Sequence, residues 1–100
     1  MLSRHRDYLL QDTKHLRAHF EVIPTGIVEV EIVDKKECHS AEFDKVRFER
    51  RGKIAKLVGQ TQSGSKKVQW QVPLRVEDAK ELEQLIEDAS EELEILMRDL

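Results

Sequence analysis

The hydrophobic and polar residues of this chain alternate with a period of two over much of its length. The clearest alternation lies in Ile27–Val33, where Val28, Val30 and Ile32 face one side while Glu29 and Glu31 face the other. Three further segments alternate: Ala41–Arg50, Lys53–Thr61 and Lys67–Leu74. In the first of these, an irregularity is expected near Asp44 and Lys45. Arg51 and Gly52, and then Gln62–Ser65, supply turns between them, since glycine reaches positive φ without steric cost. The pattern predicts a four-stranded antiparallel meander sheet over residues 21–74.

Helical periodicity flanks this sheet on both sides. Leu9, Leu16 and Phe20 recur at helical spacing, which predicts a short N-terminal helix within residues 1–20. Residues 75–100 carry a stronger signal, a strict 3-4 spacing of apolar residues at Ala79, Leu82, Ile86, Ala89, Leu93, Leu96 and Leu100. The sequence therefore predicts a single α+β domain over residues 1–100 that ends in a long, acidic helix.

The apolar seam of this C-terminal helix needs a surface to cover it. One interpretation is that the helix covers its own sheet. The other is that part of the seam packs against the same helix of a second chain, because a helix of about 37 Å is longer than a small four-stranded sheet. The residues expected at such a homodimer interface are Leu82, Ile86, Ala89, Leu93 and Leu96.

Composition narrows the class of protein. Apolar residues at 39% and charged residues at 37% are typical of a globular chain with a highly charged surface. The sequence shows neither a secretory signal nor an apolar run near the roughly 20 residues that a membrane span needs. Cys38 is the only cysteine, which excludes an intramolecular disulfide. We therefore expect a cytoplasmic protein without membrane contact. The absence of asparagine is typical of thermophilic proteins, although the six glutamines weaken that inference.

Charge is divided sharply between the two halves of the chain. From Lys45 to Leu74 there are eight basic residues and one acid, whereas Arg75–Leu100 holds ten acids and three basic residues. Ordinary solvated faces can produce such a division, since helices favour glutamate and strands tolerate lysine and arginine. The alternative is a basic sheet surface that attracts a polyanion while the acidic helix lies elsewhere.

Few residues are spaced for catalysis or metal binding. On the predicted first helix, His15 and His19 form a workable pair of metal ligands beside Asp12, but no further ligands follow at a recognisable spacing. Cys38 and His39 are adjacent, and neighbours in an extended segment point to opposite faces, so they do not form a catalytic dyad. No glycine-rich phosphate loop or nucleophile elbow is present. We therefore predict a non-enzymatic protein with no catalytic residue, metal site or cofactor.

The order of features in the second half of the chain resembles a known family. A basic strand with a turn and a second strand (VRFERRGKIAKLV) is followed by Lys66 and Lys67, and then by VQWQVPL running into VEDAKELEQLI. Residues 46–96 thereby resemble the transcriptional positive-cofactor-four family of single-stranded DNA-binding proteins. The chain lacks two features of that family, a lysine-glycine pair opening the last strand and an aromatic residue early in the helix, where it has Ala79 and Lys80.

The resemblance implies a curved antiparallel sheet that binds single strands and a dimer formed through the helices. It implies nucleic-acid contacts at Arg47, Arg50, Arg51, Lys53, Lys56 and Lys67. The function expected on this basis is non-enzymatic binding of nucleic acid, in single-stranded form, by a homodimer. The alternative is a small adaptor, viral or regulatory, that docks a protein partner through its acidic C-terminal helix.

Overall fold

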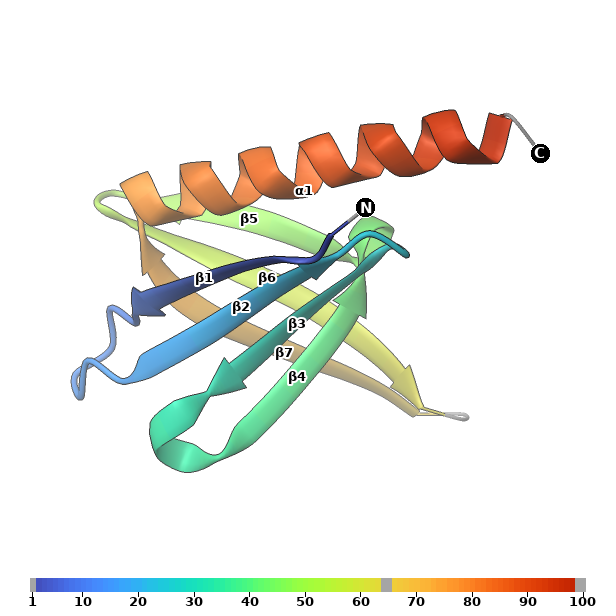
Figure 1. Ribbon diagram of the computed structural model, residues 1–100. Helices are drawn as coiled ribbons and strands as arrows, with labels where there is room; N and C mark the ends of the chain where they lie inside the picture. Colours follow the sequence, from blue (N-terminus) through green and yellow to red (C-terminus); the bar gives the residue numbers. More distant parts are fainter. Residues whose placement is uncertain (1, 64–65, 99–100) are drawn as a thin grey trace.

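The computed structural model describes residues 2–63 and 66–98, which form seven strands, two 3₁₀ turns and one α-helix (Figure 1). The elements in chain order are β1 (Arg4–Leu9), β2 (Arg17–Ile23), β3 (Ile27–Ile32), η1 (Val33–Lys35), β4 (Glu37–Glu42), η2 (Phe43–Lys45), β5 (Val46–Arg51), β6 (Ile54–Ser63), β7 (Lys66–Arg75) and α1 (Val76–Arg98). Residues 64 and 65 of the predicted turn and Leu100 of the predicted seam lie outside the described part.

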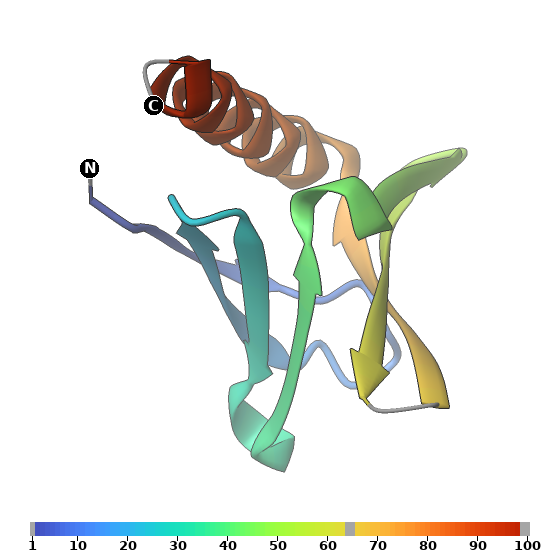
Figure 2. The same ribbon diagram turned by 90° about the vertical axis from the view of Figure 1, so that its right-hand side faces the viewer.

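The strands form two antiparallel sheets. Sheet 1 has the order β1-β2-β3-β4, and sheet 2 has the order β5-β6-β7. Figure 2 shows the two sheets on either side of the molecule, with α1 running across the top. The protein is therefore an α+β domain with antiparallel sheets, but the prediction of a single four-stranded meander is wrong.

The predicted N-terminal helix is also wrong, because residues 2–20 contain no helix and instead supply β1 and part of β2. The register pairs Arg6 with Phe20 and Tyr8 with Ala18, so both arginines of β1 face the same side as the core. An edge strand whose inward positions hold Arg4 and Arg6 shows no apolar alternation in the sequence. The helical spacing of Leu9, Leu16 and Phe20 arises by coincidence across a hairpin.

The inward arginines of β1 are compensated by carboxylates of α1. Arg6 Nε lies 3.3 Å from Glu81 Oε1, and Arg4 Nη2 lies 3.7 Å from Glu92 Oε1. The hydroxyl of Tyr8 donates to the same Glu81 oxygen at 2.5 Å. Burial, reinforced by this hydrogen bond, raises the pKa of the Tyr8 phenol. These contacts attach β1 to α1.

The alternating segment predicted over Ala41–Arg50 is divided between the sheets, and the division falls at the irregularity expected near Asp44 and Lys45. β4 belongs to sheet 1 and begins four residues before the predicted strand, whereas β5 belongs to sheet 2. The turn η2 between them lets the chain leave one sheet and enter the other. The backbone N–H of Phe43 donates to the carbonyl of Gly26 at 2.9 Å, which anchors this crossing beside the β2–β3 turn.

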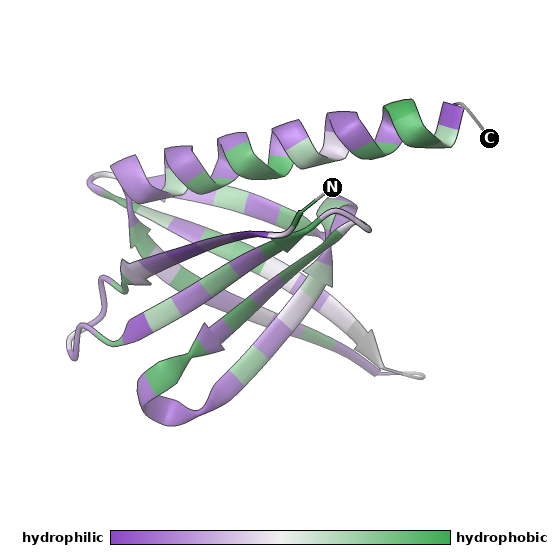
Figure 3. Ribbon diagram, in the orientation of Figure 1, coloured by the Kyte–Doolittle hydropathy of each residue, from purple (hydrophilic) through white to green (hydrophobic). Residues whose placement is uncertain are grey.

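The core lies between the inner faces of the two sheets and α1. Its most completely buried side chains come from both sheets and the helix: Phe20, Val22, Val28, Val30, Leu57, Val72, Leu74 and Leu82. On β3 the buried Val28 and Val30 alternate with exposed glutamates, and Figure 3 shows apolar and polar residues alternating along several strands.

The predicted C-terminal helix is confirmed as α1. Glu77 and Asp78 occupy its first turn, where acidic side chains complement the positive end of the helix dipole. The buried residues of the helix, Ala79, Leu82, Leu85, Ile86 and Ala89, belong to the protein's own core. In the part of the chain that the structure describes, no helix combines the length and apolar character needed to cross a membrane.

Trp70 joins sheet 2 to the edge strand of sheet 1. Its indole Nε1 donates to the backbone carbonyl of Ser40 on β4 at 3.1 Å, and its ring stacks on His39 with centroids 5.5 Å apart. Gly59 on β6 is in register with Trp70 on β7. A Cβ at Gly59 would lie 2.2 Å from Cζ2 of the indole, so only glycine leaves room for the ring.

We predict that Gly59→Ala destabilises the protein by about 1–3 kcal/mol, the usual cost of overpacking a core. For a domain of this size each kcal/mol lowers Tm by about 4–8 °C, which thermal unfolding followed by circular dichroism can measure. Trp70→Phe removes the benzo ring that the new methyl group meets. In that background the added cost of Gly59→Ala should fall, and an equal cost in both backgrounds would contradict the steric explanation.

Candidate nucleic-acid interface

Sheet 2 has one face in the core and one face directed outward. Phe48, Leu57 and Val72 are in register and face the core. Successive side chains along a strand point to opposite faces, so the neighbouring positions on each strand define the outer face. Directly opposed side chains on that face have Cβ atoms about 4.5–5.5 Å apart. Side chains from three strands are therefore close neighbours on the outer face.

The outer face of sheet 2 collects four of the six predicted contact residues: Arg47, Arg51, Lys56 and Lys67. Lys53 lies in the turn between β5 and β6. Arg50 is in register with Ala55 and Leu74 and so belongs to the inner side. The structure thus brings most of the predicted cations together and separates Arg50 from them.

The sequence analysis missed one cation of this face, Arg75. It ends β7, one residue beyond the predicted strand, and shares a register row with Arg51 and Ile54. Continuing the alternation of the last predicted strand by one residue past Leu74 would have placed Arg75 on the outer face. Three glutamines, Gln60, Gln69 and Gln71, also lie on this face and can donate and accept hydrogen bonds.

The cations of the outer face differ in how far they are already paired. Arg75 Nε lies 3.2 Å from Asp78 Oδ2, and this hydrogen bond raises the pKa of the Arg75 guanidinium. Arg47 Nε lies 3.7 Å from Glu49 Oε1, a carboxylate on this face. Among the described residues no ion pair engages Arg51, Lys53, Lys56 or Lys67. These four charges face solvent and can meet an external anion.

Aromatic side chains contribute little to this face. Trp70 is 5% exposed and belongs to the core. Phe43 and Phe48 are partly buried and pack against the core. The described outer-face positions of β5, β6 and β7 hold no aromatic residue. The described part of this face therefore offers no platform for base stacking, and its side chains are suited to contacts with anions.

The other outward surfaces have the opposite charge. The outer face of sheet 1 carries Asp7, Glu21, Glu29, Glu31 and Glu42, and most acids of α1 are exposed. A polyanion approaching the protein is repelled by these surfaces and attracted to sheet 2. The charge division seen along the sequence is thus also a division in space.

The predicted dimer interface is divided by the structure. Leu82, Ile86 and Ala89 are buried in the core of their own chain. Leu93 is half-buried, with its Cδ2 atom close above Gly26 of the β2–β3 turn. Leu96 is 48% exposed and lies next to the exposed Ile95 and Met97. Among the described residues of the seam, only those at its end are open to a second copy.

The residues considered for metal binding and nucleophilic catalysis are separated. His15 has a φ of 47° and lies in the turn between β1 and β2, so it does not share a helix face with His19. Cys38 and His39 are neighbours on β4 and point to opposite faces. Residues 2–63 and 66–98 contain no group of three or more His, Cys, Asp or Glu side chains that could hold a metal ion.

Comparison of the chain with protein-family models, curated proteins and solved structures found no match.

Proposed function

We propose that the protein binds single-stranded nucleic acid on the outer face of sheet 2, mainly through phosphate contacts. The observation that carries this proposal is the set of four cations, Arg51, Lys53, Lys56 and Lys67, which lie on or beside one outward face and have no ion pair within the described residues. Arg47 and the three glutamines extend the same face.

Single-stranded nucleic acid suits this surface better than a duplex. The face is a twisted sheet without a helix that could enter a major groove. A flexible strand can follow the twist and place its phosphates against the cations. The glutamine amides can then contact sugar, phosphate or base edges, and contacts of this kind fix position more than sequence. We therefore expect little preference for base sequence.

The proposed binding predicts that affinity for nucleic acid depends on salt concentration. If about four cations neutralise phosphates, the logarithm of the affinity falls with the logarithm of salt concentration at a slope near −3, since each contact on a single strand contributes about −0.7. Fluorescence anisotropy of a labelled single-stranded oligonucleotide across a salt series measures this slope, and a duplex of equal length is the comparison. Affinity that ignores salt, or no binding at low salt, would overturn the proposal.

A second prediction uses two adjacent arginines on opposite faces of β5. Arg51→Ala removes a cation of the outer face and should weaken binding and flatten the salt slope by about 0.7. Arg50→Ala makes the same chemical change on the inner side and should leave both quantities near the wild-type values. Equal effects of the two variants would show that the outer face is not the binding surface.

A second candidate function is docking of a partner at the end of α1. The observation that favours it is the exposed apolar group Ile95, Leu96 and Met97, which are 58%, 48% and 65% exposed. Leu2, which is 88% exposed, lines the same surface depression as Ile95 and Leu96. A second copy of the chain could cover these side chains, in line with the predicted homodimer, and so could a different protein.

Sedimentation equilibrium at micromolar concentration distinguishes these partners. If the end of α1 pairs two chains, the wild-type protein sediments as a dimer and Leu96→Glu sediments as a monomer with unchanged circular dichroism. Glu94→Gln, on the exposed acidic side of the same turn, is the control and should remain a dimer. A wild-type monomer would leave only a different protein as the partner of this surface.

A further inference from the structure

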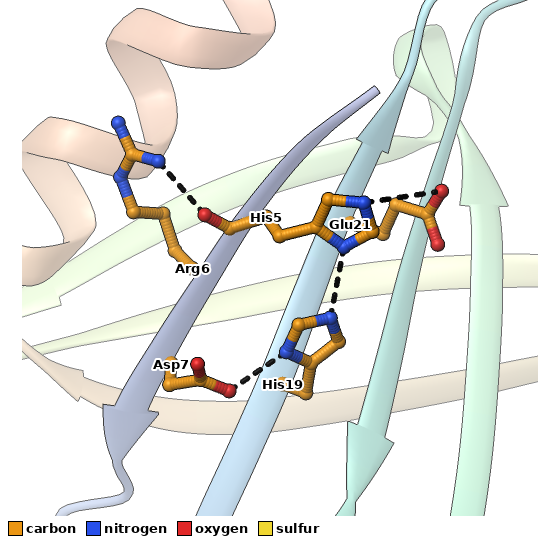
Figure 4. Close-up of polar contacts among 5 residues, drawn as sticks. All are labelled: His5, Arg6, Asp7, His19 and Glu21. Atoms are coloured by element: carbon orange, nitrogen blue, oxygen red, sulfur yellow. Dashed lines mark hydrogen bonds and ion pairs between the residues drawn. The ribbon is translucent and has the colours of Figure 1, made fainter. Parts of the chain in front are cut away.

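Two histidines meet on the outer face of sheet 1, far from each other in the sequence. β1 and β2 pair antiparallel, with His5 opposite Glu21 and Asp7 opposite His19. The two histidines are therefore diagonal neighbours on one face, and Figure 4 shows their rings side by side between the two carboxylates. The sequence analysis considered His19 with His15, whereas the hairpin gives it His5 as a neighbour.

These four side chains form a continuous polar chain. His5 Nδ1 lies 3.0 Å from His19 Nε2, with ring centroids 5.1 Å apart. At one end, His19 Nδ1 lies 2.7 Å from Asp7 Oδ1. At the other end, His5 Nε2 lies 3.9 Å from Glu21 Oε2. Each ring thus points one nitrogen at a carboxylate and the other nitrogen at its partner ring.

The Asp7 carboxylate decides which nitrogen of His19 carries a lone pair. An ionised carboxylate only accepts hydrogen bonds, so His19 donates its Nδ1–H to Asp7 and keeps the lone pair on Nε2. His5 either donates its Nδ1–H to that lone pair across the 3.0 Å contact, or carries its proton on Nε2, which lies 3.9 Å from Glu21 Oε2, and keeps the lone pair on Nδ1. In the second tautomer, two lone pairs converge between the rings. A cation is then required to hold the two nitrogens together.

We propose that a borderline divalent metal ion, of which Zn²⁺ is the natural probe, binds between His5 Nδ1 and His19 Nε2. Two Zn–N bonds of about 2.0–2.1 Å at a tetrahedral angle place their nitrogens about 3.4 Å apart. The nitrogens of the two rings are 3.0 Å apart and need to separate by only a few tenths of an ångström. The ion takes the place of the proton between the rings, and the His5 proton moves to Nε2.

The surroundings of the pair support this site. Asp7 and Glu21 act as the outer acceptors that orient metal-bound histidines in many proteins. On β3, Glu29 and Glu31 lie in register with Glu21 and His19 and add negative charge to the same face. Beneath the pair, the Arg6 guanidinium donates to the carbonyl of His5 at 2.8 Å and pairs with Glu81, which holds β1 in place.

The site is open and has two protein ligands. The absence of a group of three or more ligating side chains in residues 2–63 and 66–98 means that water or an exogenous ligand completes the coordination. The side chains of His5 and His19 are 52% and 34% exposed, so the position is reached directly from solvent. An ion held in this way exchanges readily. This proposal is independent of nucleic-acid binding, which lies on the other sheet.

Isothermal titration of the protein with ZnCl₂ in a non-chelating buffer tests the site. We expect one ion per chain, and a loss of affinity of about tenfold or more in His5→Ala and in His19→Ala. Asp7→Asn keeps both ligands but weakens the outer acceptor, and it should reduce affinity by about tenfold. His15→Ala, His39→Ala and Cys38→Ser are controls for the remaining histidines and the thiol, and each should bind as the wild type does.

Ring ¹⁵N chemical shifts of the histidines in the unaltered protein provide a second measurement that does not depend on a variant folding. Zn²⁺ should shift His5 Nδ1 and His19 Nε2 and leave the rings of His15 and His39 unchanged. The proposal is overturned by an absence of saturable binding, by unchanged affinity in His5→Ala or His19→Ala, or by a loss of binding in Cys38→Ser.

Discussion

The hydrogen bonds that Trp70 and Thr61 donate to one carbonyl of β4 hold the two sheets together. Ser40 lies on the outer edge of sheet 1, where a strand presents backbone groups that no further strand satisfies. The indole of Trp70 and the hydroxyl of Thr61 both donate to the Ser40 carbonyl. The edge is therefore closed by side chains of sheet 2 instead of by another strand. Because of this closure the two inner faces enclose one core.

The joining of the two sheets also determines where charged side chains can lie. Each sheet has only one face left for solvent, and α1 covers the open side of the core (Figure 2). The strands of sheet 2 hold their cations on the outward face, and sheet 1 holds carboxylates and two histidines on its own. One small fold thereby presents two surfaces with different chemistry, one suited to anions and the other to cations.

The sequence predicts those elements whose apolar residues repeat visibly. The C-terminal helix, the strand beginning at Ile27 and the hairpin around Gly52 all have this pattern, and all are present. The grouping of Arg47, Lys56 and Lys67 on one face also follows from simple alternation.

The first two strands and the division into two sheets could not be predicted in this way. Arg4 and Arg6 face inward because acids more than seventy residues later compensate them, and no local pattern reveals such a partner. The exchange of sheets at η2 depends on a backbone contact between Phe43 and Gly26. The pairing of His5 with His19 in turn requires β1 to be a strand.

The inward arginines of β1 also bear on how chains behave when they are crowded. β1 is the other edge of sheet 1, and an exposed edge can recruit another chain and grow into an aggregate. Adding a strand there would bring a neighbour's side chains against Arg4 and Arg6, whose charges are already matched by Glu92 and Glu81. An added strand without carboxylates at those positions would gain little binding energy from the contact. The two ion pairs that attach β1 to the helix therefore also protect the sheet from uncontrolled growth.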